Sequence, residues 1–267
     1  MGVFRFKRFE VVNERSAMKV NTDGVLLGAS MTVKQTDRRL LDIGTGTGTI
    51  ALMAAQRLTD VKGRSIEEAD PFAETHGNAS PDRPSYESAV IHAIDIDQVS
   101  VEEARLNFEK SSWGSIMHAF HSSLDEFSAD LPDDCRYDLI FSNPPYFEDS
   151  LLAPLQRRSN ARHTSTGLSY RELLDFASSR LSQQGRISIV LPAEQEHALC
   201  RHARMNNLHL FRILRIRTVE RKEPCRIVAE FSRNRCDAPQ EELLTIQSEG
   251  KYTQEYLSLT HEFYLFA

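Results

Sequence analysis

The chain has 267 residues, of which 40% are hydrophobic, a formal net charge of −6 and four cysteines. This length suffices for one large α/β domain with a full core, and a second domain is not required. The cysteines form no Cys-X-X-Cys pair, which argues against a disulfide framework and a zinc site. No apolar run is long enough to cross a membrane, and the first residues lack the apolar core of a signal peptide. We therefore expect a cytoplasmic protein without a bound metal.

Short apolar runs alternate with helical patterns along most of the chain. The expected helices cover residues 23–31, 48–58, 98–110, 169–183, 194–206 and 253–264. The expected strands cover residues 39–43, 89–95, 116–120, 137–142, 186–191, 208–218, 224–232 and 242–247. This alternation is typical of an α/β fold with a doubly wound sheet. We expect the sheet to be mostly parallel, with an antiparallel last strand.

One main domain is expected at residues 37–267, and residues 1–36 should form an amino-terminal segment that packs on it. Residues 60–88 interrupt the alternation with a polar, turn-rich stretch. Connections between a helix and the next strand normally have about two to six residues. We therefore interpret this stretch as a surface insertion without a catalytic part.

A glycine-rich turn follows the first expected strand of the main domain. Gly44, Gly46 and Gly48 are spaced G-X-G-X-G, which differs from the dinucleotide fingerprint. Glycines in such a turn allow a ligand to approach the backbone closely. Asp42 lies just before the turn, where its carboxylate favours a cationic ligand over a pyrophosphate. An ordinary tight turn between a strand and a helix is the alternative.

The next expected strand ends in acidic residues. An acid at the end of the second strand of such a fold commonly accepts hydrogen bonds from both hydroxyls of a ribose. We assign that role to Asp95, and we expect Asp97 to cap the following helix.

Asn143-Pro144-Pro145-Tyr146 is the most informative motif, because it directly follows the apolar strand 137–142. The two prolines fix the backbone and remove two donors, which leaves carbonyl groups as acceptors. The amide oxygen of Asn143 and the carbonyl of Pro144 would accept from an amino group, and Tyr146 would stack on a planar ring. A proline-rich turn is the alternative for this segment taken alone.

Basic residues gather in three parts of the chain, although the net charge is negative. The first group lies within residues 1–19 and includes Lys19, and the second follows the Asn-Pro-Pro-Tyr motif as Arg157, Arg158 and Arg162. The third extends over residues 201–235. Local basic patches bind phosphates whatever the overall charge. They favour RNA as a partner, whereas a solvated charged face is the alternative for each group.

Taken in order, the glycine turn, Asp95 and the Asn-Pro-Pro-Tyr motif resemble S-adenosylmethionine-dependent methyltransferases that act on an amino nitrogen. Residues 16–28, Ser-Ala-Met-Lys-Val-Asn-Thr-Asp-Gly-Val-Leu-Leu-Gly, are similar to the signature of bacterial tRNA1(Val) adenine N6-methyltransferases. The ending at residues 256–266 also resembles that family. The match extends over most of the chain, and the amino-terminal signature is more specific than the tetrapeptide.

The resemblance implies a Rossmann-like class I methyltransferase sheet, S-adenosyl-L-methionine as cofactor and tRNA as partner. It implies a catalytic set formed by the tetrapeptide, and it adds Thr22, Ile96 and Asn143 to the cofactor-binding residues. Family members usually carry an acid after the third strand that accepts from the adenine of the cofactor. Here Ser123 occupies that place, with Asp125 as a second candidate.

Two other functions stay open. Glutamine methyltransferases that modify a release factor share the tetrapeptide, although the basic groups and residues 16–28 argue against this activity. A non-catalytic RNA-binding module on the same fold is the second alternative, and it would bind no cofactor.

Overall fold

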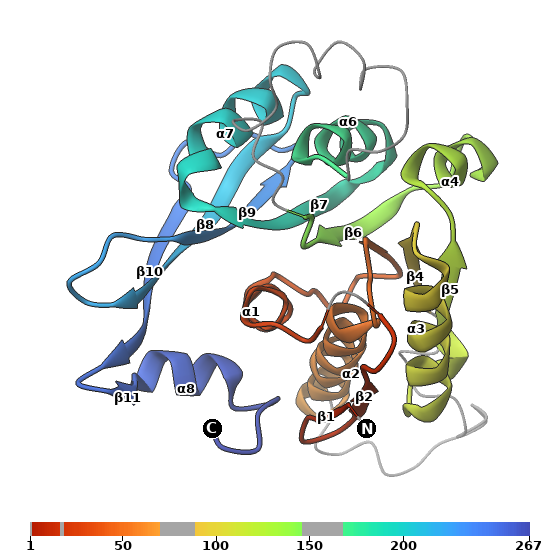
Figure 1. The fold of residues 1–267 in the computed structure, drawn as a ribbon. Coiled ribbons are helices and arrows are strands. Elements are labelled where there is room, and N and C mark those ends of the chain that lie inside the picture. Colours follow the sequence, from red (N-terminus) through yellow and green to blue (C-terminus); the bar gives the residue numbers. More distant parts are fainter. Residues whose placement is uncertain (1, 17–18, 70–88, 146–167) are drawn as a thin grey trace, which may run out of the picture.

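The protein is described here by a computed structural model over residues 2–16, 19–69, 89–145 and 168–267. Within these ranges the chain forms a nine-stranded sheet and a separate two-stranded sheet. From one edge to the other, the strands of the large sheet are β11 (Lys251–Tyr252), β10 (Gln240–Ser248), β8 (His209–Val219), β9 (Arg226–Ser232), β7 (Leu181–Pro192), β6 (Tyr137–Ser142), β3 (Arg39–Ile43), β4 (Val90–Asp95) and β5 (Met117–His121) (Figure 1).

The large sheet is mostly parallel, as predicted. Strands β3 to β7 are parallel to their neighbours in this group. β9 runs antiparallel to both β7 and β8, while β10 returns to the parallel direction beside β8. The short last strand, β11, is antiparallel to β10. The predicted α/β fold class is therefore confirmed.

The strand order reverses beside β3. The chain passes from β3 to β4 and β5 in one direction, and β6 then returns to the other side of β3. The hydroxyl of Ser142 donates to the carbonyl oxygen of Ile43 at 2.7 Å and joins the carboxyl ends of β6 and β3. Ligands of open α/β sheets bind at the carboxyl edge where the strand order reverses. The predicted motifs therefore meet at the edge where a ligand is expected.

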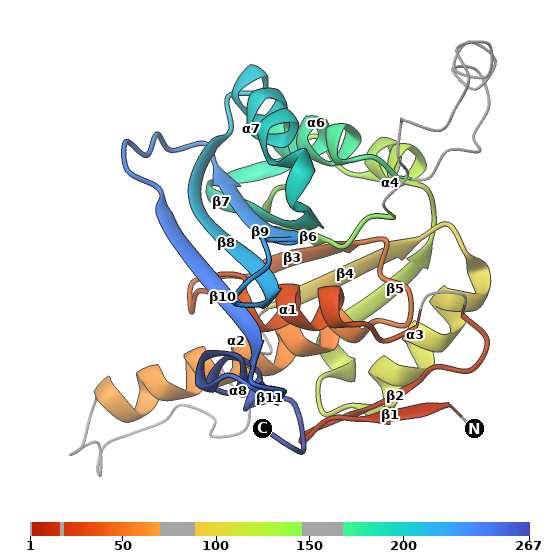
Figure 2. The same cartoon turned by 60° about the vertical axis from the view of Figure 1, so that its left-hand side comes forward.

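Helices cover both faces of the sheet and enclose two cores. On one face lie α1 (Thr22–Ser30), α2 (Thr49–Ala69) and α3 (Gln98–Lys110), and on the other lie α4 (Leu124–Asp130), α6 (Tyr170–Arg180) and α7 (Glu196–Met205) (Figure 2). The buried apolar residues divide accordingly into two clusters, one for each face. The sheet is thus the middle layer of three, and α8 (Gln254–Thr260) packs near α1 and β10.

The amino-terminal segment is held on α3 by two buried polar side chains. It begins with the antiparallel pair β1 (Val3–Arg5) and β2 (Glu10–Val12), which the sequence did not indicate. Glu103 accepts from the backbone N–H groups of residues 14, 15 and 16 at 2.9, 2.7 and 3.0 Å. Asn107 exchanges two hydrogen bonds with the backbone of Val12 and donates a third to the carbonyl of Thr47. The predicted division of the chain at residue 36 stays a prediction.

Other elements also differ from the sequence-based expectations. The expected helix 169–183 ends at Arg180, and β7 begins directly after it at Leu181, so Gly185 lies within the strand and does not end the helix. α2 continues to Ala69, well beyond the expected end at residue 58, because its polar second half contains no proline. The helical turns therefore take up the first part of the expected insertion, and residues 70–88 lie outside the described residues. α4 was missed, although Ser123 and Glu126 form a capping box, because only a few apolar residues mark it.

Candidate active site

The glycine turn after β3 adopts a backbone that requires glycine. Gly44, Gly46 and Gly48 have φ angles of 73°, 55° and 81°, all in the left-handed region. A Cβ atom on Gly48 would lie 2.4 Å from Cε1 of Phe108, so the turn also packs directly on α3. Asn107 donates to the carbonyl of Thr47 from the same helix. The turn is therefore a fixed cradle of backbone atoms.

Asp42 is fully buried beneath this turn. Its Oδ2 accepts from the hydroxyl of Thr45 at 2.7 Å, whereas its Oδ1 has no hydrogen-bond partner among the described residues. Burial raises the pKa of Asp42 to about 7. An ionised carboxylate at this place is costly unless a positive charge lies nearby. The environment of Asp42 therefore fits a cationic ligand bound at the turn.

Asp95 ends β4 and connects to the glycine turn. Its Oδ2 accepts from the backbone N–H of Gly46 at 2.8 Å, and its Oδ1 accepts from the N–H of Asp97 at 2.9 Å. Burial raises the pKa of Asp95 above its usual value, against the effect of these donors. Each oxygen keeps acceptor capacity for a hydroxyl group. Asp97 caps α3 through the N–H groups of Val99 and Ser100, which confirms its predicted structural role.

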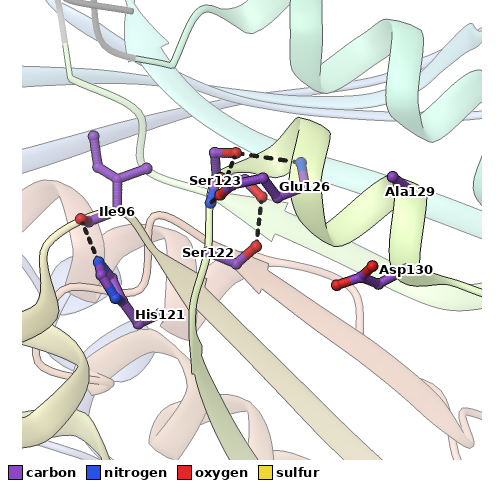
Figure 3. Close-up of a pocket in the computed structure, with 7 residues that line it drawn as sticks. All are labelled: Ile96, His121, Ser122, Ser123, Glu126, Ala129 and Asp130. Atoms are coloured by element: carbon purple, nitrogen blue, oxygen red, sulfur yellow. Dashed lines mark hydrogen bonds between the residues drawn. The ribbon is translucent and has the colours of Figure 1, made fainter.

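A hollow lies between the ends of β4 and β5 and the start of α4. Figure 3 shows its lining residues, which are Ile96, His121, Ser122, Ser123, Glu126, Ala129 and Asp130. The side chain of Ile96 is 67% exposed and offers an apolar surface next to Asp95. This hollow fits the flat base of a nucleoside whose ribose lies at Asp95.

The hollow offers several polar partners for such a base, and the role of Ser123 stays a prediction. The Ser123 hydroxyl donates to Oε2 of Glu126 at 2.8 Å and accepts from the Glu126 N–H at 3.2 Å, so it is engaged in the α4 cap. Glu126 and Asp130 add carboxylates to the lining beside Ser123, whereas Asp125 is absent from it. Glu126 was not predicted as a site residue, because only the first turn of α4 brings it back beside Ser123. Its signal was the Ser-X-X-Glu spacing of a capping box.

A second hollow joins the amino-terminal segment, the glycine turn and the end of β6. Its lining consists of Lys19, Val20, Asn21, Gly24, Gly44, Thr45, Gly46, Thr47, Thr49, Ile50 and Asn143. Three segments that are distant in sequence therefore meet here. Asn143 is half-buried, and Pro144 behind it is buried. Pro145 is half-buried, while Tyr146 lies outside the described residues.

Asn21 was not among the predicted site residues. It caps α1, and its Oδ1 accepts from the N–H of Gly24 at 2.8 Å. Asn21 also accepts from Nδ2 of Asn143 at 3.4 Å. Thr22 is exposed and does not line this hollow, so its role at the cofactor stays a prediction. An asparagine just before the helical pattern was the available signal for the cap.

Several side chains of the three basic groups are already engaged in hydrogen bonds or ion pairs with other parts of the protein. Arg157, Arg158 and Arg162 lie outside the described residues, and the ammonium of Lys19 donates to two backbone carbonyls at 3.0 Å. The ion pairs among the other groups are Arg5–Glu10, Arg8–Asp60, Arg15–Glu102, Arg212–Glu230, Arg212–Glu242, Arg215–Glu196, Arg215–Glu241 and Arg226–Asp23. Glu10 and Glu230 lie within the basic groups themselves, whereas the other acids come from outside these groups in the sequence.

The described residues contain no group of three or more His, Cys, Asp or Glu side chains placed to hold a metal ion. None of the helices in these ranges combines the length and apolar character that a membrane span needs.

The site residues fit S-adenosylmethionine. A cradle without Cβ atoms lies beside Asp42, whose buried carboxylate favours a positive charge, and S-adenosylmethionine carries a sulfonium and an ammonium. Asp95 suits the ribose, and the hollow at Ile96 suits the adenine. A doubly wound sheet with this site at its switch point defines a class I, S-adenosylmethionine-dependent methyltransferase.

Comparisons with known proteins agree with this class and narrow it. The family described as an RMKL-like methyltransferase domain matches residues 26–218. The tRNA1(Val) (adenine(37)-N6)-methyltransferase of Parabacteroides distasonis is 37% identical over 98% of this chain and 97% of the relative. The enzyme of that name from Flavobacterium psychrophilum is 35% identical over 98% of this chain and 99% of its own. The chain belongs to the family of tRNA1(Val) (adenine(37)-N6)-methyltransferases.

Solved structures show the same fold at low sequence identity. A methyltransferase from Pyrococcus furiosus superposes with a TM-score of 0.56 at 15% identity, over 84% of this chain and 89% of that one. A predicted O-methyltransferase from Agrobacterium tumefaciens gives a TM-score of 0.55 at 16% identity, over 89% and 95% of the two chains. At this identity the likeness concerns the fold alone.

Proposed function

We propose that this protein transfers a methyl group from S-adenosylmethionine to the exocyclic N6 of an adenosine in tRNA, at position 37 of tRNA1(Val). The relatives that carry this name match almost the full length of the chain. The observation that carries the proposal is the position of Asn143, which shares one hollow with the glycine turn. A donor of the methyl group and its amino acceptor would therefore meet at the end of β6.

The residues of the site have separate roles in the proposed reaction. S-adenosylmethionine supplies an electrophilic methyl group when it is bound. Asp95 holds the ribose hydroxyls, while Ile96 and the hollow beside it take the adenine. Asn143 accepts a hydrogen bond from the target amino group through its amide oxygen, and the carbonyl of Pro144 accepts a second.

These two acceptors raise the reactivity of the target nitrogen, which is a weak nucleophile. The lone pair of an exocyclic adenine nitrogen is delocalised into the ring, and holding both N–H bonds favours a pyramidal nitrogen that points its lone pair at the methyl carbon. A nitrogen–carbon bond forms while the carbon–sulfur bond breaks, and the nitrogen then releases one proton. Alignment accounts for most of the catalysis, so a strong general base is not required.

We assign the recognition of RNA to residues that flank this site. Tyr146 stacks on the target base, which must leave the anticodon loop to reach Asn143. Arg157, Arg158, Arg162 and Lys19 bind phosphates of the tRNA. We also propose a cytoplasmic location, since the proposed substrate is tRNA.

The two alternatives are less well supported. A protein glutamine methyltransferase would share the tetrapeptide, but the full-length relatives carry the name of a tRNA-modifying enzyme. A non-catalytic RNA-binding module gives no reason for a buried carboxylate beside a left-handed glycine turn. Calorimetry with S-adenosylmethionine separates the module from an enzyme, because the module binds no cofactor.

Mass spectrometry of nucleosides tests the proposed function directly. Unmodified tRNA incubated with the enzyme and labelled cofactor should yield labelled N6-methyladenosine, whereas a release-factor protein should stay unlabelled. Asn143→Ala should lower the turnover number by on the order of 10²-fold or more with little change in cofactor affinity, because its hydrogen bond tightens toward the transition state. Methylation by Asn143→Ala at the wild-type rate would show that the assigned mechanism is wrong.

A further inference from the structure

The carboxamide of Asn21 is held in one orientation by two backbone groups. Its Oδ1 accepts from the N–H of Gly24 at 2.8 Å, and its Nδ2 donates to the carbonyl of Lys19 at 3.2 Å. A flipped Asn21 amide would place its NH₂ group against the N–H of Gly24 and its oxygen against the carbonyl of Lys19. The assignment of oxygen and nitrogen in Asn21 is therefore fixed by its surroundings.

This fixed orientation determines which atom of Asn143 faces Asn21. The Oδ1 of Asn21 is an acceptor, and the nearest amide atom of Asn143 is its Nδ2 at 3.4 Å. The reverse arrangement would bring two oxygen atoms together and lose the hydrogen bond. The amide oxygen of Asn143 consequently lies on the side of the carboxamide that faces away from Asn21.

We propose that Asn21 is a positioning residue that selects the productive orientation of the Asn143 carboxamide. The inference rests on the proposed function, in which Asn143 must present its oxygen to the target amino group. A flipped Asn143 would present an NH₂ group to an NH₂ group and would repel the substrate. Asn21 thus contributes to turnover through Asn143, without a bond to the base.

The surroundings of Asn21 hold it in place for this role. The first turn of α1 is tied to β9 by the ion pair of Asp23 with Arg226 at 2.9 Å. Lys19, two residues before Asn21, donates to the carbonyls of residues 13 and 14. Asn21 is therefore anchored on both sides, and the segment that carries it is packed against α3.

Substitutions that preserve the helix cap separate positioning from folding. Ser, Asp and Asn are all good caps, so α1 should persist in each variant. Asn21→Ser has a side chain too short to cap α1 and to reach Asn143 at once. Its kcat should fall by about tenfold, while the KM for S-adenosylmethionine and the melting temperature change little. Asn21→Asp keeps an acceptor toward Asn143 and should recover most of the lost turnover.

A double-mutant cycle with Asn143 gives the decisive measurement. Single-turnover rates with saturating cofactor are compared for Asn21→Ser, Asn143→Ala and the double variant. If Asn21 acts through Asn143, Asn21→Ser should change the rate by less than about twofold in the Asn143→Ala background. If instead the effects of the two substitutions on the rate multiply, Asn21 does not act through Asn143. A wild-type kcat in Asn21→Ser would likewise overturn the positioning role.

These results are distinct from a failure of the proposed function. That failure appears as unchanged methylation by Asn143→Ala alone, or as the absence of labelled N6-methyladenosine with the wild-type enzyme. If Asn143→Ala has no measurable turnover, the comparison of Asn21→Ser with Asn21→Asp decides. Equal loss of kcat in both variants would contradict the inference, because only the serine lacks the acceptor.

Discussion

Replacing Glu103 by glutamine should weaken the attachment of the amino-terminal segment to α3 while it preserves the shape of the side chain. The carboxylate is 1% exposed, and it accepts three backbone hydrogen bonds, two at Oε1 and one at Oε2. Glutamine has a single acceptor oxygen, so at most the two bonds at Oε1 survive, and they lose their charge. Its NH₂ group then faces the N–H of Ser16, which is buried.

The magnitude follows from the bonds that are lost. A hydrogen bond to a charged group contributes about 1.5–3 kcal/mol, a neutral one about 0.5–1.5, and an unsatisfied buried donor costs about 1–3. Residues 14 and 15 are not fully buried, so their contribution is reduced. We expect the free energy of unfolding to fall by about 2–4 kcal/mol, measured by urea denaturation with an unchanged m-value.

The adjacent residue offers a matched control. Glu102 pairs with Arg15 at 3.0 Å, but the two side chains are 42% and 58% exposed. Glu102→Gln should therefore cost less than about 1 kcal/mol, as is usual for surface ion pairs. A loss below about 0.5 kcal/mol in Glu103→Gln, or equal losses in both variants, would refute the reasoning, since the buried bonds would then contribute no more than a surface pair.

The pH dependence of the difference gives a second test. Burial alone would raise the pKa of Glu103, but the N–H donors of residues 15, 16 and 14 together lower it below its usual 4.5. A lowered folded-state pKa stabilises the protein above the unfolded value and loses this effect as pH falls through the folded value. The advantage of the wild type over Glu103→Gln should thus be full above pH 4.5 and shrink in acid.

Three further predictions concern the cofactor site. Asp95→Ala should weaken S-adenosylmethionine binding by about 1.5–3 kcal/mol in calorimetry, and an unchanged affinity in the folded variant would move the ribose site elsewhere. Gly48→Ala should destabilise the protein by about 2–4 kcal/mol through overpacking and a left-handed φ. Gly63→Ala in α2 should stabilise it slightly, because a Cβ atom there would meet no atom within 4 Å. Equal melting temperatures of the two variants would contradict both expectations. Burial raises the pKa of Asp42 to about 7, so ionisation of this carboxyl opposes folding. Without cofactor, the wild type should therefore lose stability relative to Asp42→Asn as pH rises from about 4 to 7. Parallel pH profiles of stability for the two proteins would argue against this pKa.

Features that depend on local sequence could be predicted well. The strands beside the glycine turn are short and mostly apolar, and β3 and β6 have the bounds that the sequence indicated. The cap at Asp97 also follows from neighbouring residues alone. In these cases the physical cause lies within about ten residues of its effect, and the short-range pattern contains it.

Features that join distant segments could not be predicted. Asn21 and Asn143 are 122 residues apart, and nothing in either neighbourhood indicates a contact between the two amides. The ion pairs of Arg212 and Arg215 could not be predicted for the same reason, because their acidic partners lie on other elements. The order of charged residues along the chain does not show which of them the sheet brings together as ion pairs.

The packing of the amino-terminal segment has a consequence for biosynthesis. The ribosome makes residues 12–16 early, yet their partners, Glu103 and Asn107, follow some ninety residues later. The partners of Lys7 are made later still, because its ammonium donates to the carbonyls of His261 and Ala267. The nascent chain therefore carries residues 12–16 without their partners until α3 has been made, and Lys7 until the carboxyl-terminal residues follow. Cofactor binding during synthesis should accordingly require a chain that extends at least through α3.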